Sequence, residues 1–314
     1  MILFPLFIGG RGDFFAWKVK KVITVLLVLG TIGLYSFSTL TIKAYQMSAG
    51  QGHLSISFLN FIYAGSVFLS FIAAKGFQLH YTDITLMLAI VFGVGLIVYN
   101  SIKVKAASCG PMSILSMSYV IGGVTIPSLY GLIFLKEPII LHKILGILLI
   151  FLSFVPLLLK SRKQMVFKPK FLIFCFLLLV LNGTLMTMSK IAQLNSDSKY
   201  SMDYVTLYFF FAFLSAGFLL AKNLHLPDQQ ELQKTMTLRN FAYAIASGLL
   251  NGIGSVLNYM LSFRIPASVQ FPLTQSSMLV VVTVMSLILY QEKPDKATVL
   301  SLLISIASIV LISI

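Results

Sequence analysis

The sequence predicts an all-α membrane protein whose chain crosses the bilayer ten times. Of its 314 residues, 58% are hydrophobic and 10% are charged, and the mean hydropathy is +0.95. Soluble domains carry about 25% charged residues, so most of this chain must face lipid rather than water. Ten apolar runs approach or exceed the length of about 20 residues that spans the hydrocarbon core. They cover residues 22–43, 54–74, 84–102, 107–135, 139–159, 171–190, 202–221, 238–263, 267–290 and 297–314.

Charged residues separate these runs, because a charge is costly inside the hydrocarbon and favourable at its surface. In the first half the boundaries are marked, in order, by Lys21, Lys43, Lys75, Asp83, Lys103, Lys136 and Lys160. In the second half they are marked by Lys170, Lys190, Lys199, Lys222, Arg239, Arg264, Glu292 and Lys296. The longest connection, residues 222–237, is too short to fold as a domain, so we expect no soluble catalytic module.

The N-terminal segment, residues 1–21, is expected to be a tail. Its short apolar piece, residues 2–8, precedes the charged residues. A secretory signal peptide has the opposite order, with charge before the apolar run. We therefore expect the first span to serve as the insertion signal itself.

The net charge of +14 comes from 23 Lys and Arg against 9 Asp and Glu. In a soluble chain such an excess would suggest nucleic acid as a partner. So little of this chain remains in water that we expect no nucleic-acid binding, and the basic residues instead contact lipid headgroups and set orientation. They divide almost evenly between the two sides of the membrane, with a small excess opposite the N-terminus. Charge alone therefore slightly favours an external N-terminus.

The two halves of the chain repeat one spacing of residues. Pro111, Glu137, Gly146 and Ser153 follow one another at the same offsets as Pro266, Glu292, Ser301 and Ser308. Likewise Ser36, Lys43 and Gln46 match Gly183, Lys190 and Gln193. The spacing divides the chain into a five-helix repeat at 22–160, a basic linker at 161–170 and a second five-helix repeat at 171–314. An odd number of spans per repeat inverts one half relative to the other, which is a transporter architecture with a site between the halves.

This pattern resembles the EamA family of the drug/metabolite transporter (DMT) superfamily. The likeness covers residues 22–314, and it departs from the family at Tyr35-Ser36 and Asn182-Gly183, where an aromatic-Gly pair is usual. The resemblance implies a multi-pass protein of the plasma membrane with both termini in the cytoplasm. For the orientation we follow this resemblance, because the difference in Lys and Arg count between the two sides is small.

Amide and hydroxyl side chains are the best candidates for contacts with a solute. In the eighth span Asn251 and Asn258 share one face with Ser255, and Tyr259 lies beside them. The ninth span carries Gln270 and Thr274 near two prolines, and Thr274 matches Tyr119 of the fourth span under the repeat. Prolines that interrupt helices at matched positions point to a binding site. We expect a substrate site formed by Asn100, Tyr119, Asn251, Asn258, Tyr259, Gln270 and Thr274, with hydrogen bonding between helices as the alternative role.

Two matched pairs of charged residues lie at the ends of spans. Lys43 and Lys190 are candidates for a gate or a contact with substrate charge, and snorkelling of their ammonium groups to the membrane surface is the alternative. Glu137 and Glu292 each precede the turn into the next helix, where a carboxylate can accept backbone N–H bonds. We expect them to act as structural helix-end residues rather than as carriers of charge.

No acidic residue is predicted to lie mid-membrane, since all nine, including Asp203, fall in tails, loops or span ends. Their placement counts against proton-coupled efflux of cations. The chain has no P-loop and no nucleophile–base or metal constellation in any span, so we expect no enzyme activity, no cofactor and no metal.

Together these features predict a secondary transporter. It would move a small polar or amphipathic metabolite by alternating access, with export as the leading direction. Its partners would be the small-molecule substrate and the lipid bilayer, while a coupling ion and a monomeric or homodimeric state are left open. The alternatives are efflux of drugs or lipophilic cations, and a sensor or partner subunit that moves no solute.

Overall fold

The computed structural model describes residues 11–50, 52–107, 109, 112–138, 140–162, 169–224, 229–289 and 296–313. All regular structure in these segments is helical. In chain order the helices are α1 (Arg11–Ala49), α2 (His53–Ala74), α3 (Asp83–Ala107), α4 (Met112–Ile133), α5 (Leu141–Arg162), α6 (Pro169–Leu194), η1 (Ser198–Tyr200), α7 (Ser201–Leu224), α8 (Gln229–Thr235), α9 (Leu238–Ser262), α10 (Ala267–Leu289) and α11 (Lys296–Ser313).

Ten of these helices are long, and each coincides with one predicted apolar run. Within the described residues, seven helical segments are long and apolar enough to cross a membrane, in α1, α2, α3, α6, α7, α9 and α10. Three shorter apolar segments, Ser118–Ile133, Ile144–Pro156 and Val299–Ile312, lie in α4, α5 and α11. The chain is therefore a multi-pass helical membrane protein.

The first helix is longer than predicted. It begins at Arg11, so the second part of the expected tail is helical. After Gly12 the chain contains no proline or glycine before Gly30, and nothing local ends the helix. At its other end α1 stops before Gly50, which adopts a φ of 84°, a left-handed conformation that glycine reaches without strain.

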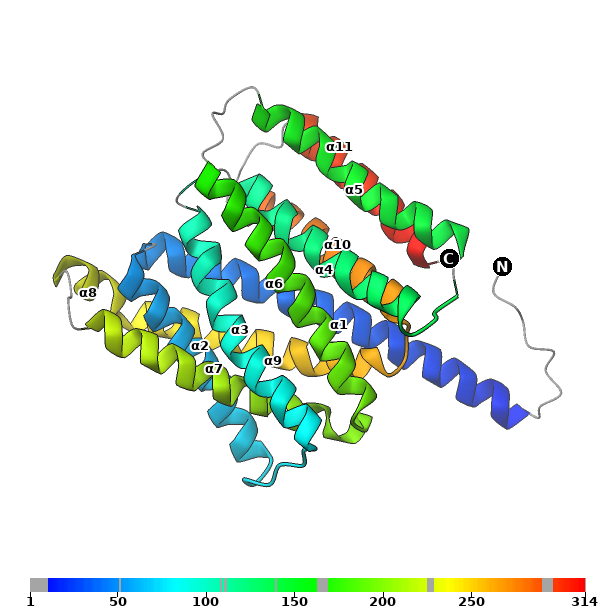
Figure 1. Ribbon diagram of the computed structural model, residues 1–314, viewed down its shortest axis with the longest axis horizontal. Helices are drawn as coiled ribbons and strands as arrows, with labels where there is room; N and C mark the ends of the chain where they lie inside the picture. Colours follow the sequence, from blue (N-terminus) through cyan, green and yellow to red (C-terminus); the bar gives the residue numbers. More distant parts are fainter. Residues whose placement is uncertain are drawn as a thin grey trace.

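The helices associate mainly between the two halves of the chain. Figure 1 shows α5 and α11 side by side at one edge of the bundle, with α4 and α10 next to them. Beyond these pairs α6 packs on α4, α1 packs on α9 and α2 packs on α7. The short helix α8 contacts α1 and α2 near the turn that joins them. Contacts across the halves thus hold the bundle together.

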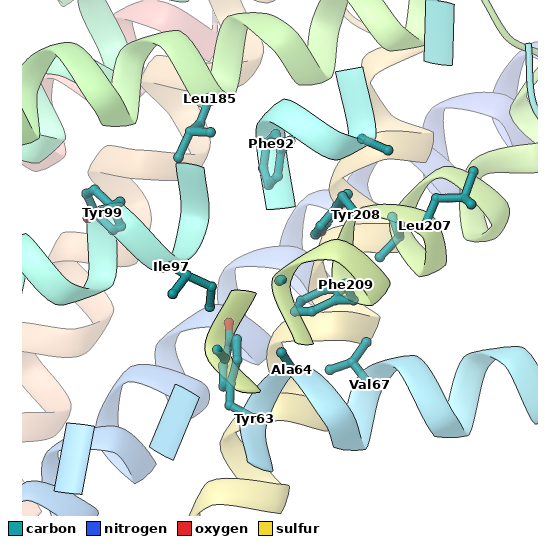
Figure 2. Close-up of a cluster of buried hydrophobic side chains, with 14 of the residues drawn as sticks. Tyr63, Ala64, Val67, Phe92, Ile97, Tyr99, Leu185, Leu207, Tyr208 and Phe209 are labelled. Atoms are coloured by element: carbon teal, nitrogen blue, oxygen red, sulfur yellow. The ribbon is translucent and has the colours of Figure 1, made fainter. Parts of the chain in front are cut away.

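The main hydrophobic core lies between α2, α3, α6 and α7. Tyr63, Phe92, Tyr208 and Phe209 meet there with Leu185, as Figure 2 shows. The rings of Phe92 and Tyr208 have centroids 4.4 Å apart. Large side chains such as Leu29 remain 61% exposed on the outside of the bundle, as expected for surfaces that face lipid.

Small residues bring α9 close to α2. A Cβ atom added at Gly248 would lie 2.5 Å from the carbonyl oxygen of Tyr63. One added at Gly252 would lie 2.5 Å from Cγ1 of Val67. These glycines, four residues apart, form the kind of interface that permits close packing of membrane helices. The close approach places the polar face of α9 against the centre of the bundle.

Candidate functional site

A cavity lies between the two halves of the bundle. Its walls come from α1, α2, α3, α4, α6, α7, α9 and α10, and its volume is about 200 Å³. The lining mixes aromatic rings with amide and hydroxyl groups. Such a mixture of apolar walls and a few polar groups is typical of sites for small molecules.

One end of the cavity lies where α1 ends and α2 begins. Gln46, Ile56 and Lys103 line this end and are half-buried. At the other end the lining reaches Val205 and Tyr259, each of which is 1% exposed. We take the more exposed end of the lining as the mouth of the cavity and the end at Tyr259 as its floor.

Five of the predicted substrate-site residues come together in this cavity. Asn100, Tyr119, Asn251, Asn258 and Tyr259 all contribute to its wall. They come from α3, α4 and α9, which are far apart in sequence.

Gln270 and Thr274, also predicted for the substrate site, are not among the described residues that line the cavity. The Gln270 amide donates to the backbone oxygen of Asn258 at 2.8 Å and to its Oδ1 at 3.1 Å. Thr274 turns its hydroxyl back to the carbonyl oxygen of Gln270 at 2.8 Å. Both side chains are buried, and that of Gln270 supports the position of Asn258. Gln275, the residue after Thr274, lines the cavity in their place.

Two further amides in the wall were not predicted. Asn60 of α2 accepts a hydrogen bond from Asn100 at 3.1 Å. Asn182 of α6 donates to the backbone oxygen of Tyr119 at 2.7 Å. Asn182 occupies the position that corresponds to Tyr35 in the repeat, and Tyr35 also lines the cavity. The correspondence between Tyr35 and Asn182 in the repeat is the sequence signal that points to these two residues.

The predicted pair of lysines lies outside the cavity lining. Lys190 is 5% exposed and donates to the backbone oxygen of Ser262 at 2.6 Å, which links α6 to α9 at the closed end. Lys43 is half-buried near the open end of α1. The structure thus places Lys190 in an interhelical contact.

Glu137 bonds to a helix start, although not to that of the next helix in sequence. Its Oε1 accepts from the backbone N–H of Ala267 at 2.7 Å, and its Oε2 accepts from that of Ser268 at 2.9 Å. These groups begin α10, whose first N–H groups have no partner within the helix. Glu292, its predicted counterpart, lies outside the described residues.

Aromatic residues close the floor of the cavity. The ring of Tyr204 stacks on Tyr259 with centroids 4.9 Å apart. The hydroxyl of Tyr259 forms a hydrogen bond of 2.8 Å with Ser196, which lies between α6 and η1. Tyr204 and Ser196 also line a second hollow on the far side of this layer. Side chains that contact one another thus line both the cavity and the second hollow.

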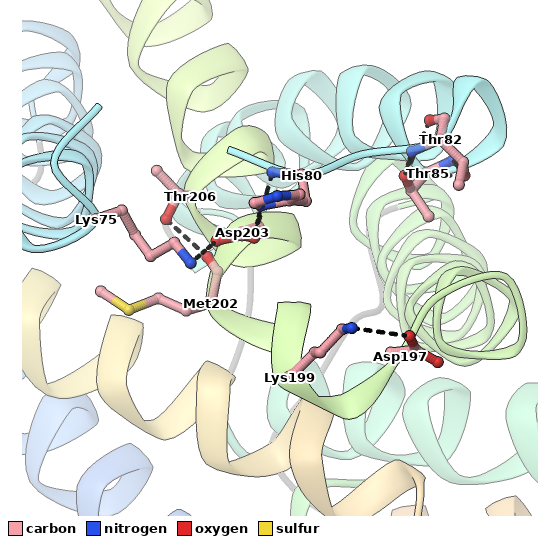
Figure 3. Close-up of polar contacts among 9 residues, drawn as sticks. All are labelled: Lys75, His80, Thr82, Thr85, Asp197, Lys199, Met202, Asp203 and Thr206. Atoms are coloured by element: carbon pink, nitrogen blue, oxygen red, sulfur yellow. Dashed lines mark hydrogen bonds and ion pairs between the residues drawn. The ribbon is translucent and has the colours of Figure 1, made fainter. Parts of the chain in front are cut away.

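Asp203 is not a loop residue, contrary to the sequence analysis. It lies in the first turn of α7, is 0% exposed, and forms an ion pair with Lys75 at 2.8 Å (Figure 3). The backbone N–H of His80 donates to its other oxygen at 3.3 Å. The boundary of the apolar run gave no indication that this carboxylate is buried. It joins α7 to the α2–α3 connection at the closed end.

Lys103 is the lining residue that sequence reasoning missed most clearly. Its ammonium lies 4.5 Å from the ring centroid of Tyr119 and 5.8 Å from that of Tyr99. In the sequence Lys103 is one of the charged residues that mark the end of the third span. Its spacing of three from Asn100, which puts both on one face of a helix, was the available signal.

Comparison with known proteins decides the family. Residues 169–314 match the EamA-like transporter family. These residues form an EamA-like transporter domain. The chain thus carries a domain of the EamA-like transporter family of the DMT superfamily, as the sequence predicted. The EamA-like domain comprises the helices from α6 to α11.

The fold agrees with a solved structure, and no curated protein matches the sequence. A protein described only as "Crystal structure of protein" superimposes with a TM-score of 0.69 and 15% identity. The match covers 93% of this EamA-like chain and 98% of the other chain. At this identity the likeness shows a common fold along nearly the whole length.

Proposed function

We propose that this EamA-like chain is a secondary transporter that exports a small polar or amphipathic metabolite. Alternating access between two inverted five-helix halves would carry the solute across the membrane. The observation that carries the proposal is a cavity with one mouth, lined by amides and aromatic rings from both halves. Asn100, Tyr119, Asn251, Asn258 and Tyr259 would contact the solute.

The lining of the cavity supports the inverted repeat. Positions on α1 and α6, on α2 and α7, and on α3 and α9 line it in pairs, and within each helix pair the offset along the chain is constant. The pairs are Tyr35 and Asn182, Ser38 and Leu185, Thr39 and Met186, Ile42 and Ser189, Ile56 and Val205, Leu59 and Tyr208, Phe92 and Asn251, Leu96 and Ser255, Tyr99 and Asn258, and Asn100 and Tyr259. Equivalent positions that face one cavity are expected when two halves are related by a twofold axis through it.

The pattern of helix packing supports the same symmetry. In the repeat α6 is the counterpart of α1, and α9 is the counterpart of α3. The contact of α1 with α9 therefore corresponds to a contact of α6 with α3, and both contacts exist. The contacts of α4 with α6 and of α10 with α1 form a second such pair. Helices α2 and α7, α4 and α10, and α5 and α11 each pack against their own counterpart. The twofold axis would pass between these three pairs.

The two ends of the bundle depart from this symmetry in the way that alternating access requires. At the closed end α6 packs against α9, and Lys190 bonds to Ser262. The counterparts of these helices are α1 and α3, at the open end. In the described chain α1 and α3 pack against each other less than α6 and α9 do. In the opposite state α1 and α3 would approach and α6 and α9 would separate. Lys43 would then act at the mouth as Lys190 acts here.

The resemblance to EamA proteins supports a plasma-membrane location with cytoplasmic termini. In that orientation the mouth of the cavity faces outwards, because α1 starts in the cytoplasm and ends at the mouth. The state described here would be the one that has released an exported solute.

Mass spectrometry of spent medium tests the function. The chain is overexpressed in its native host beside a deletion strain, and the metabolites that rise outside with expression are identified. The variant Asn258→Leu should abolish that rise, because it removes an amide from the cavity wall while the volume stays similar. Ile253→Leu, an exposed position of the same helix, is the matched control. If no metabolite depends on expression and only tolerance to lipophilic cations changes, drug efflux replaces this proposal.

A further inference from the structure

We infer that the cavity selects a solute that carries an anionic group, a carboxylate or a phosphate, and that Lys103 is the residue that recognises it. The inference rests on the proposed function and names the class of its substrate. Among the lining residues that the structure describes, Lys103 is the only one with a charged side chain. The fixed charge of the site is therefore +1, and no lining carboxylate balances it.

The position of Lys103 leaves its ammonium available to a ligand. The group lies 4.5 Å from the ring centroid of Tyr119, a cation–π contact that holds it at the cavity wall without an acceptor oxygen. Within the described part of the chain no hydrogen bond or ion pair engages it. Tyr99 and Tyr119 meet edge to face with centroids 6.2 Å apart, which fixes the two rings beside the ammonium. An anion in the cavity would therefore find a positioned cation.

A second donor lies close to this charge. Asn60 is 4% exposed and lines the cavity, and its Oδ1 accepts from Asn100, three residues before Lys103 on the same face of α3. Its amide nitrogen is buried without a hydrogen-bond partner among the described residues. Buried donors are normally satisfied, and an unpaired one in the wall of a cavity indicates a missing acceptor. The oxygen of an anionic group is such an acceptor.

The rest of the lining defines the body of the solute. Phe92, Tyr208 and Tyr259 supply apolar faces deeper in the cavity, and Asn251 and Asn258 supply amides. This arrangement suits an organic anion with a small apolar or aromatic body and a polar substituent. A lipophilic cation would meet the like charge of Lys103 with no acid to offset it.

Binding of three matched probes tests the inference. Indole-3-acetate, indole-3-acetamide and tryptamine share one ring system and carry, at neutral pH, a negative, a neutral and a positive side group. Thermal unfolding of the purified full-length chain is followed against the concentration of each probe. We expect indole-3-acetate to bind most tightly. Lys103→Met should weaken its binding about tenfold, to the level of the amide, because a charge-assisted contact is lost.

Two variants keep the result interpretable. Lys103→Arg preserves the charge and should retain most of the preference for the acid. Lys105→Met removes an exposed lysine that does not line the cavity, and it should change nothing. Equal binding of the three probes, tighter binding of tryptamine, binding of none, or an unchanged preference in Lys103→Met would overturn the inference. Failure of the proposed function is distinct, because it would appear as absent export in the spent medium while the preference for the acid persists.

Discussion

Glu137, from the first half of the chain, caps the helix that Ala267 begins in the second half. One carboxylate oxygen accepts the N–H of Ala267 at 2.7 Å, and the other accepts that of Ser268 at 2.9 Å. A carboxylate at this position also meets the positive end of the helix dipole. A residue that follows α4 thus helps to fix α10 at the closed end of the cavity.

Glu137→Gln should lower the stability of the protein. The neutral amide can accept only one of the two hydrogen bonds well and loses the interaction with the helix dipole. We expect a loss of about 1–2 kcal/mol, seen as a lower unfolding temperature of the protein in detergent. Asp197→Asn is the control, because Asp197 is 72% exposed in a loose pair with Lys199 at 3.8 Å, and such pairs contribute little. Equal effects of the two changes would contradict a capping role for Glu137.

Gly248→Ala should weaken the packing of α9 on α2. The new Cβ would lie 2.5 Å from the carbonyl oxygen of Tyr63, a backbone atom that can move only with its helix. Overpacking of this kind costs about 1–3 kcal/mol. Gly33→Ala is the matched change in a helix, since no atom lies within 4 Å of its added Cβ. Thermal unfolding should separate the two variants, and a similar loss in both would refute this packing argument.

Asp203→Asn should be strongly destabilising. Asp203 is fully buried, and its neutral replacement would leave Lys75 without its partner at 2.8 Å. Breaking a buried pair by removing one charge costs about 3–5 kcal/mol. The single variant Lys75→Met and the double variant Lys75→Met with Asp203→Asn complete a cycle, in which the double variant should lose less than the two single losses together. Additive losses, measured by thermal unfolding, would show that the two residues do not interact.

Lys190→Met should loosen the closed end of the cavity. The bond of Lys190 to Ser262 joins α6 to α9, and its loss removes a contact specific to this state. We expect faster modification of a cysteine placed at Ser189, in the cavity wall, by a membrane-impermeant maleimide applied from the closed face. Cys109 and Cys175 are replaced beforehand.

Lys43→Met is the matched control for the gate. Lys43 is the counterpart of Lys190 at the open end, so its removal should not raise labelling from the closed face. Faster labelling in both variants would indicate general loosening of the bundle instead of release of one gate.

The long helices could be predicted from the sequence because the thickness of the bilayer sets the number of consecutive apolar residues that a spanning helix needs. It missed α8 and η1, which are too short to leave such a signal. Asn258 and Asn100 were found because a polar residue inside an apolar run needs a partner, and each partner lies at the centre of the bundle. The matched spacing of the halves also gave a reason to look at Tyr119.

Other site residues depended on information that a single helix does not carry. Gln270 and Asn258 are equally polar in sequence, and only packing decides that one lines the cavity while the other supports it. Lys103 and Asp203 lie near the ends of their runs, where charge is ordinarily solvated. Whether such a residue points inwards depends on the neighbouring helices.

In three helix pairs, α2 with α7, α4 with α10, and α5 with α11, a helix of one half packs against a helix of the other. Each half buries its surface mainly against the other half, much as the subunits of a symmetric dimer do. The family match covers residues 169–314 alone, yet most of the helix packing of that segment in the described chain is against the first half. We therefore expect the two halves to depend on one another for folding.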